Sequence, residues 1–218
     1  MSENNLFAPM VDYLTRDDAR FNIIEGATHC PDKIGHGYIP SYERIAAELG
    51  PSANVCELGV AGGASLKMWR EQFFPGGIVA GVDVCGVWPP NTVKITSEQT
   101  ASDLPGRMAK ISPSWNLIID DCSHDGNLTL ESWKLLWPLV APGGYYVIED
   151  WINADDPNGY YEIDEDFKAS VSDIDRPDEP MLKMALSLVE RIRRDAEIES
   201  IEYRRCTNDG LIILQKRK

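Results

Sequence analysis

Carboxylates end two apolar, strand-like runs of this chain. Leu117-Ile118-Ile119 leads into Asp120-Asp121-Cys122-Ser123-His124, and Val147-Ile148 leads into Glu149-Asp150. An ionised carboxylate is costly to bury unless a metal, a base or a ligand compensates its charge. A helix-like segment separates the two runs, which is the spacing of neighbouring strands in one sheet. We interpret the two acidic strand ends as parts of one divided site.

The residue types at these strand ends suit metal-assisted chemistry on hydroxyl groups. Asp121, Glu149 and Asp150 offer three hard oxygen ligands, and Mg²⁺ (or another divalent cation) prefers such ligands while keeping several waters. Two vicinal hydroxyls of a substrate could replace two waters, and a bound cation lowers the pKa of a coordinated hydroxyl. His124, three residues after Asp121, can accept the proton as general base. Taken alone, His124 is more often a surface or capping histidine, and Glu149-Asp150 a capping pair, so the prediction depends on the combination.

The remaining pattern predicts the elements that position these groups. Strands are expected at 54–58, 78–83, 92–95, 115–120 and 145–149, and helices at 41–49, 64–74, 100–110, 127–140 and 180–192. Asn127 is the expected cap of the helix over 127–140, and Pro142-Gly143-Gly144 its stop signal. Ile198–Arg205 and Leu211–Lys216 flank Thr207-Asn208-Asp209-Gly210, which predicts a hairpin.

This alternation of strands and helices predicts an α/β fold. We expect a Rossmann-like, doubly wound, mostly parallel seven-stranded sheet with a C-terminal antiparallel hairpin, as a single domain over residues 1–218. Ligands bind beyond the carboxyl ends of such strands, where the glycine turn after residue 58 and the acidic strand ends would meet. Residues 1–40 are predicted to cover the site. Residues 152–180 form an acidic segment, which is either an ordinary solvated loop or a lid over the substrate.

Composition excludes several classes of partner. The chain has 218 residues and a formal net charge of −14, which argues against binding to nucleic acid or to an anionic membrane surface. No run approaches the roughly 18 apolar residues of a membrane span. The five cysteines form no CxxC pair, and the first residues lack the pattern of a signal peptide. We therefore expect a cytoplasmic protein.

A glycine turn follows the first strand. Glu57-Leu58-Gly59-Val60-Ala61-Gly62-Gly63 does not fit the GxGxxG spacing of dinucleotide-binding sites, and Glu57 would repel a phosphate but attract an ammonium or a sulfonium. Asp83 ends the second strand, where an acid can bind ribose hydroxyls. This pattern resembles the class I S-adenosylmethionine (SAM) methyltransferases. The resemblance implies that Glu57 and the turn with Gly59 and Gly63 lie against the methionine part of SAM. It also implies that Asp83 binds the ribose, and that Glu98 and Gln99 contact the adenine.

A narrower resemblance covers roughly residues 30–155. The segments DKIGHGYIPSYE, GGASLKMWREQFFPGG, DDCSHDG and APGGYYVIEDW are similar to the metal-dependent deoxysugar O-methyltransferases of the mycinamicin, macrocin and rhamnosyl types and to cephalosporin-hydroxylase-like relatives. The resemblance implies that Asp121, Glu149 and Asp150 bind magnesium, that His124 is the base, and that Asp120 faces the cofactor. It places His36, Tyr38 and Tyr42 in a segment over the site. The expected catalytic residues are thus His124 and Asp121, with SAM and Mg²⁺ as cofactors.

The expected reaction is methylation of a hydroxyl on a deoxyhexose or rhamnose-like sugar, in a small molecule or glycan with vicinal hydroxyls. A catechol-type phenol is an alternative acceptor, but a phenol depends less on a histidine base. An NAD-dependent sugar oxidoreductase or epimerase is a second alternative, disfavoured by the absent GxGxxG. A non-catalytic SAM-fold subunit is a third. The sequence leaves the acceptor hydroxyl and a homo-oligomeric state open.

Overall fold

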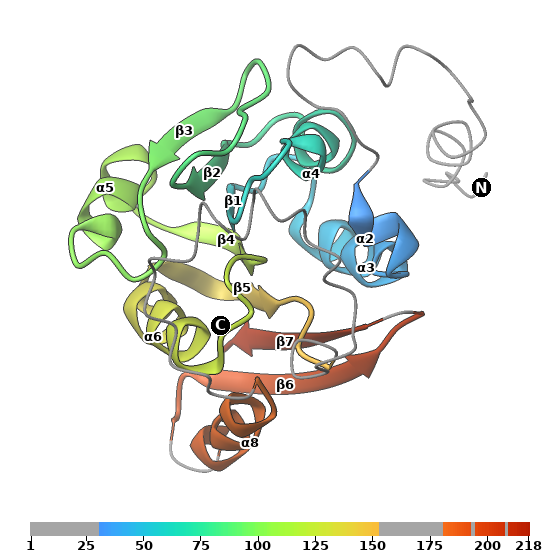
Figure 1. Cartoon of the computed structure of the whole chain (residues 1–218), viewed down its shortest axis with the longest axis vertical. Helices are drawn as coiled ribbons and strands as arrows, with labels where there is room; N and C mark the ends of the chain where they lie inside the picture. The colour runs from blue at the N-terminus through green and yellow to red at the C-terminus, as the bar shows by residue number, and fades with distance from the viewer. Residues whose placement is uncertain (1–30, 153–180, 193–194, 208) are drawn as a thin grey trace, which may run out of the picture.

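The computed structural model describes residues 31–152, 181–192, 195–207 and 209–218. Its centre is one seven-stranded sheet in the order β3-β2-β1-β4-β5-β7-β6 (Figure 1). The strands are β1 (Val55–Leu58), β2 (Val79–Asp83), β3 (Val93–Thr96), β4 (Trp115–Asp120), β5 (Val140–Ile148), β6 (Ile198–Arg205) and β7 (Gly210–Lys216). The first five strands pair in parallel, whereas β7 is antiparallel to both β5 and β6. The predicted α/β fold with a C-terminal antiparallel hairpin is confirmed.

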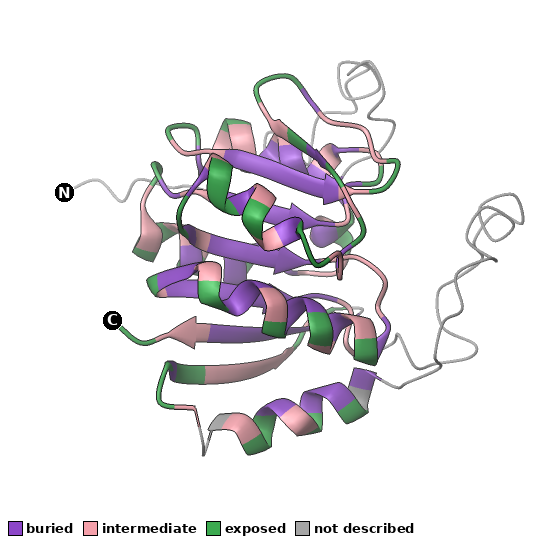
Figure 2. Cartoon of the chain, turned by 90° about the vertical axis from the view of Figure 1, so that its left-hand side faces the viewer, coloured by how far each residue is buried: buried purple, intermediate pink, exposed green. Residues whose placement is uncertain are grey.

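Helices cover both faces of the sheet (Figure 1). The helices are α2 (Asp32–Gly35), α3 (Ile39–Leu49), α4 (Ala64–Met68), α5 (Leu104–Ile111), α6 (Gly126–Leu136) and α8 (Met181–Ile192). Residues of α3 and α4 pack on one face of β1, β2, β4 and β5, and residues of α5, α6 and α8 pack on the other. The central strands are buried on both faces (Figure 2), which is why they read as continuous apolar runs in the sequence.

Prolines account for two helix boundaries that the sequence pattern misplaces. The predicted helix 100–110 begins only at Leu104, with Pro105 in its first turn, where a missing N–H costs nothing. The predicted helix 127–140 ends as α-helix at Leu136 and continues as a 3₁₀ turn over Trp137–Leu139 that contains Pro138. The helix predicted over 64–74 is likewise divided, because α4 passes into a five-residue π-helical segment at Trp69–Phe73.

The start of β5 and the cap of α6 also differ from expectation. Pro142-Gly143-Gly144 lies inside β5, next to an irregularity in its pairing with β4, and is not the stop of the preceding helix. The N-cap of α6 is Asp125, not Asn127, because the Asp125 carboxylate accepts hydrogen bonds from the backbone N–H groups of Asn127 and Leu128, both at 3.0 Å. This cap fixes the chain directly after His124.

Two further expectations can be placed against the structure. Among the described residues, no helix is long and apolar enough to cross a bilayer. The acidic segment predicted as a loop or lid lies almost wholly at 153–180, outside the described residues, as do residues 1–30 of the predicted covering segment.

Candidate active site

The parallel strands bring the two acidic strand ends together. Asp120 pairs with Leu58 of β1 and with Ile148 of β5, so the residues that follow all emerge at one edge of the sheet. Backbone bonds continue this alignment, from Asp121 N to Leu58 O (2.9 Å) and from Glu149 N to Asp120 O (3.0 Å). The divided site inferred from the sequence is therefore a contiguous region of the structure.

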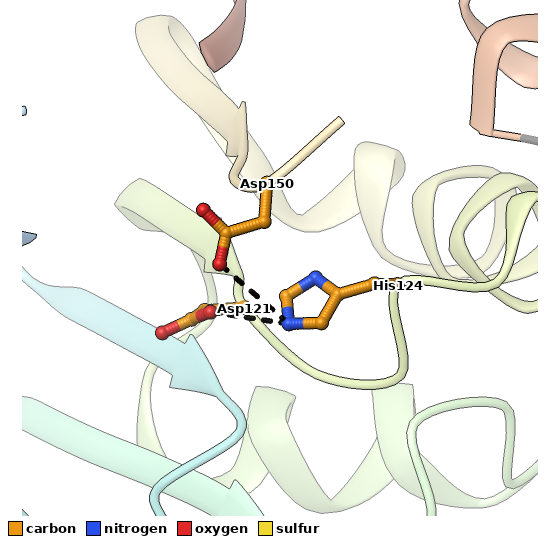
Figure 3. A group of neighbouring side chains, drawn as sticks. All are labelled: Asp121, His124 and Asp150. Atoms are coloured by element: carbon orange, nitrogen blue, oxygen red, sulfur yellow. Dashed lines mark ion pairs between the residues drawn. The ribbon is translucent and has the colours of Figure 1, made fainter. Parts of the chain in front are cut away.

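Three predicted residues converge there. One ligand atom from each of Asp121, His124 and Asp150 lies within 4.8 Å of the others. His124 Nε2 is 3.7 Å from Asp121 Oδ1 and 3.8 Å from Asp150 Oδ2 (Figure 3). We call Asp121, His124 and Asp150 the acidic triad. Two carboxylate oxygens and an imidazole nitrogen at this spacing are a suitable donor set for a divalent cation.

The backbone is strained at two members of the triad. His124 has φ of 53° and Asp150 has φ of 54°, in the left-handed region that non-glycine residues seldom adopt. Such conformations cost about 1–2 kcal/mol and persist where the surrounding structure imposes them. Both conformations turn their side chains toward the same point at the sheet edge, so the strain coincides with the candidate chemistry (Figure 3).

Each triad carboxylate has one oxygen held by the segment before β1. Lys33 Nζ donates to Asp121 Oδ2 at 2.6 Å, leaving Oδ1 directed at His124. His36 Nδ1 donates to Asp150 Oδ1 at 3.0 Å, and the hydroxyl of Tyr38 donates to the same oxygen. The second oxygen of Asp150 faces His124. The predicted covering segment thus orients both carboxylates.

Glu149, the remaining predicted metal ligand, lies beside the triad in a different environment. Its Oε1 accepts from the hydroxyl of Tyr42, and its Oε2 lies 3.1 Å from Lys33 Nζ. The side chain is only 2% exposed. The structure therefore brings Asp121, His124 and Asp150 together and holds Glu149 against Lys33 and Tyr42.

Lys33 is the residue of this region that sequence reasoning missed. Its ammonium is fully buried and lies within 3.1 Å of three carboxylates, those of Glu57, Asp121 and Glu149. Its bond to Asp121 joins residues 88 positions apart, and no local spacing indicates such a contact. The available signal was the segment itself, since Lys33 precedes His36, Tyr38 and Tyr42 in the DKIGHGYIPSYE motif.

The electrostatics of the region favour a further cation. Burial raises the pKa of Asp121 and of Glu149, although Lys33 counteracts it in both cases. Burial would lower the pKa of Lys33, but its three carboxylates keep that pKa above its ordinary value. Burial tends to raise the pKa of Asp150 as well, but that pKa is lowered overall by His36, His124 and Tyr38. Three carboxylates thus surround the single ammonium of Lys33, and Asp150 lies beside them, so a divalent cation would relieve the excess of negative charge.

The glycine turn is shaped by close backbone contacts. Gly59 has φ of 85°, and a Cβ there would lie 1.7 Å from the backbone oxygen of Asp121; Gly63 has φ of 78°. Asp83 Oδ2 accepts from Val60 N (2.7 Å) and Ala61 N (3.0 Å). Asp83 therefore fixes the turn, in addition to the ribose contact predicted for it. Glycine at position 59 lets the turn approach the strand that carries the triad.

The other predicted cofactor residues occupy different surroundings. Glu57 is fully buried, and its Oε1 lies 3.0 Å from Lys33 Nζ. Glu98 is exposed, whereas Gln99 is buried and donates to Ser132 Oγ at 2.9 Å. Asp120 accepts from the hydroxyl of Tyr146 at 2.9 Å, and burial raises its pKa to about 7.

Several curated proteins are similar to just over half of this chain, two of them as follows. The 8-demethyl-8-(2-methoxy-alpha-L-rhamnosyl)-tetracenomycin-C 3'-O-methyltransferase of Streptomyces olivaceus is 37% identical over 137 residues, which are 57% of this chain and 35% of the relative. Mycinamicin VI 2''-O-methyltransferase of Micromonospora griseorubida is 32% identical over 126 residues, 53% of this chain and 31% of the relative. No protein-family model matches the chain.

A solved structure extends the likeness to the fold. The MycE methyltransferase of the mycinamycin biosynthetic pathway, in complex with Mg, SAH and mycinamycin VI, matches with a TM-score of 0.64 and 25% identity, over 83% of this chain and 50% of that one. This chain resembles the deoxysugar O-methyltransferases. The resemblance predicted from the DDCSHDG and VIED motifs is confirmed.

The methyltransferase resemblance is regional. The chain spans about a third of the length of the two curated methyltransferases, 35% and 31%. A protein of Corynebacterium glutamicum is matched over 96% of this chain and 94% of its own, with a TM-score of 0.60, and at 18% identity it shows the shared fold alone. The arrangement of this domain thus also occurs in a chain of similar extent.

Proposed function

We propose that this chain transfers a methyl group from SAM to a hydroxyl of a sugar, with the help of a divalent cation such as Mg²⁺. The convergence of Asp121, His124 and Asp150 at the carboxyl edge of the sheet carries the proposal. The similar proteins are named as O-methyltransferases of a rhamnosyl-tetracenomycin C and of mycinamicin VI, and MycE was solved with Mg and SAH. The acceptor would be a deoxyhexose or rhamnose-like sugar in a glycoside, natural product or polysaccharide.

The donor atoms of the triad fit a divalent cation. Asp121 Oδ1 and Asp150 Oδ2 are the oxygens that face His124, while the second oxygen of each is anchored by Lys33 or by His36 and Tyr38. We propose Asp121 and Asp150 as ligands, with Glu149 as the third. When bound, the cation would lower the pKa of a coordinated sugar hydroxyl.

His124 is the proposed general base. Its Nε2 lies 3.7 Å from Asp121 Oδ1 and 3.8 Å from Asp150 Oδ2, beside the oxygens proposed to hold the cation and the acceptor hydroxyl. The hydroxyl oxygen then attacks the methyl carbon, and the bond from that carbon to the SAM sulfur breaks. Asp121 and Asp150 contribute by holding the acceptor in line, since alignment supplies much of the acceleration in such a transfer.

The turn after β1 is the proposed binding site for SAM. Two features fit this role. Gly59 and Gly63 adopt positive φ, which lets the backbone turn tightly and approach a ligand, and a Cβ added at Gly62 would meet nothing within 4 Å, so that face of the turn is open. Asp83 Oδ2 accepts hydrogen bonds from two N–H groups of the turn, and Oδ1 accepts one from Cys85 N at 2.9 Å. Because a carboxylate oxygen can accept a second hydrogen bond, Oδ1 can also bind a ribose hydroxyl. The proposed cofactor residues are Glu57, Gly59, Gly63, Asp83, Glu98, Gln99 and Asp120.

Calorimetric titration tests this proposal first. SAM and NAD would be titrated separately into the protein in the presence of Mg²⁺, and an L-rhamnosyl glycoside and a catechol would then be offered as acceptors with labelled SAM. We expect SAM to bind at one site, NAD not to bind, and the label to reach the glycoside. Binding of NAD without SAM would favour an oxidoreductase, transfer to catechol alone would favour a phenol methyltransferase, and SAM binding without transfer would favour a non-catalytic subunit.

The same proposal covers the surroundings of the enzyme. We place it in the cytoplasm, with residues 1–218 as one methyltransferase domain that acts on a small molecule or glycan and not on nucleic acid or membranes, in line with its acidic composition. Size-exclusion chromatography would show whether it is a homo-oligomer.

A further inference from the structure

Lys33 is a cation built into the acidic region. Among the lysines that the structure describes, only Lys33 is buried, with 0% of its side chain exposed. Its Nζ lies 2.6 Å from Asp121 Oδ2, 3.0 Å from Glu57 Oε1 and 3.1 Å from Glu149 Oε2. A lysine ammonium is a compact charge with three donors, and here it has three carboxylate neighbours.

Two of these neighbours are proposed metal ligands. Lys33 holds one oxygen of Asp121 and one of Glu149, and the other oxygen of Glu149 accepts from Tyr42. Both oxygens of Glu149 are therefore engaged, and the ligand atoms that converge in the triad come from Asp121, His124 and Asp150. For Glu149 to serve as a ligand together with Asp121, the ammonium must release it or share it with the metal.

We propose that Lys33 competes with the divalent cation, because its ammonium occupies part of the set of carboxylates that the cation uses. This inference rests on the proposed function. Binding of the metal moves Lys33 away from Glu149, and the ammonium keeps Glu57, which lies on the side of the glycine turn. Lys33 is thus a positioning residue that sets the affinity for the metal and links the metal ligands to the cofactor end of the site.

The charges explain why the chain would contain such a competitor. Glu57 and Glu149 are buried and Asp121 is largely buried beside them, and buried carboxylates without a cation are strongly destabilising. Lys33 compensates one of the three charges when no metal is bound. Because like charges at this range repel in a partly buried site, the same ammonium weakens the binding of a second cation.

The experiment is a calorimetric titration of Mg²⁺ alone into the wild type, into Lys33→Met and into Lys67→Met. Methionine is similar in length and carries no charge. Lys67 of helix α4 pairs with the exposed Glu71 of the following π-helical segment, which makes it a matched control. We expect Lys33→Met to bind Mg²⁺ about tenfold more tightly or better, with Lys67→Met unchanged. Equal or weaker binding by Lys33→Met would overturn the competition.

A measurement on the wild type covers the case in which Lys33→Met does not fold. The ¹⁵N signal of a buried lysine ammonium can be followed by NMR while Mg²⁺ is added, with Lys33→Arg used to assign it. We expect the Lys33 signal to change as Mg²⁺ saturates the protein, and an unchanged signal would refute the inference. If neither the wild type nor Lys33→Met binds Mg²⁺, the metal site of the proposed function fails as well; if both bind equally, only the role of Lys33 fails.

Discussion

At the scale of single residues, the site depends on carboxylates that divide their two oxygens between different tasks. Asp121 gives one oxygen to Lys33 and directs the other at His124, and Asp150 divides its oxygens between His36 with Tyr38 and His124. Such anchoring fixes the orientation of each carboxylate before a metal binds, which lowers the conformational entropy that is lost on binding. His124 itself contacts both carboxylates through Nε2.

Substitution of His124 separates a base from a metal ligand. His124→Asn keeps a residue type that tolerates the left-handed backbone found at φ of 53°. If His124 is the base, turnover should fall by about 10²–10⁴-fold, while the affinities for Mg²⁺ and SAM stay at the wild-type level. The measurement is turnover with labelled SAM beside calorimetry of each ligand. Loss of Mg²⁺ affinity together with turnover would instead identify His124 as a ligand of the metal.

At the scale of elements, the strand ends and the turns after them position the chemistry. The pairing of β1, β4 and β5 places the glycine turn after β1, Asp121 and Glu149 side by side. Asp125, the residue directly after His124, caps the start of α6 and so ties His124 to that helix. Asp83, at the end of β2, holds the neighbouring turn through the N–H groups of Val60 and Ala61.

Asp83→Asn should destabilise the protein in a pH-dependent way. Burial tends to raise the pKa of Asp83, but N–H donors from Cys85, Val60 and Ala61 prevail and lower it below its ordinary 3.8. The ionised form is thus favoured in the folded state, and its contribution is present above about pH 4 and is lost as the pH falls through the folded pKa. At neutral pH we expect the free energy of unfolding to fall by about 1–2 kcal/mol. This is the lower part of the range for hydrogen bonds to charged groups, because Asp83 is only half-buried.

Urea unfolding from pH 7 down to the lowest pH at which both proteins unfold reversibly would measure this effect. The difference between the wild type and Asp83→Asn should narrow at the acid end. A difference that stays constant across the range would show that the carboxylate charge does not hold the turn.

At the scale of the whole molecule, segments distant in sequence close the site from two sides. Thr207 N, after β6, donates to His36 O at 2.9 Å, and Tyr38 donates to Gly210 O at 3.3 Å, so the hairpin β6–β7 supports the segment that carries Lys33 and His36. The site is acidic within a protein of net charge −14. A cation bound there would therefore stabilise the fold as a whole.

Removal and return of the metal tests this expectation. Because a ligand that binds only the folded state adds RT ln(1 + [L]/Kd), Mg²⁺ at a hundred times its Kd should add about 2.7 kcal/mol, a rise of roughly 5–10 °C in the thermal midpoint of a domain of this size. Protein treated with EDTA should stay folded, since Lys33 still compensates the carboxylates. Asp150→Asn serves as the control and should lose most of the rise. An equal rise in wild type and Asp150→Asn would place the stabilising cation elsewhere.

The sequence by itself determined the sheet, its antiparallel end and the edge at which the acids meet. Runs such as Leu117–Asp120 carry a local signal of a buried strand, a short continuous apolar stretch. Because parallel strands end at one edge of the sheet, the acids after such runs can be predicted to form one site. Helix ends were less well determined, because prolines such as Pro105 and Pro138 fit a first turn as readily as they break a helix.

Only the tertiary structure decided which partner each polar group of the site has. Lys33 among three carboxylates, Asp83 on the turn and Gln99 on Ser132 are contacts between segments far apart in the chain, and no local pattern encodes them. The direction of each oxygen of Asp121 and Asp150 likewise depends on backbone angles and packing at the strand ends. Residue types indicate which chemistry is within reach, whereas three-dimensional contacts decide which groups are held and which face the reacting atoms.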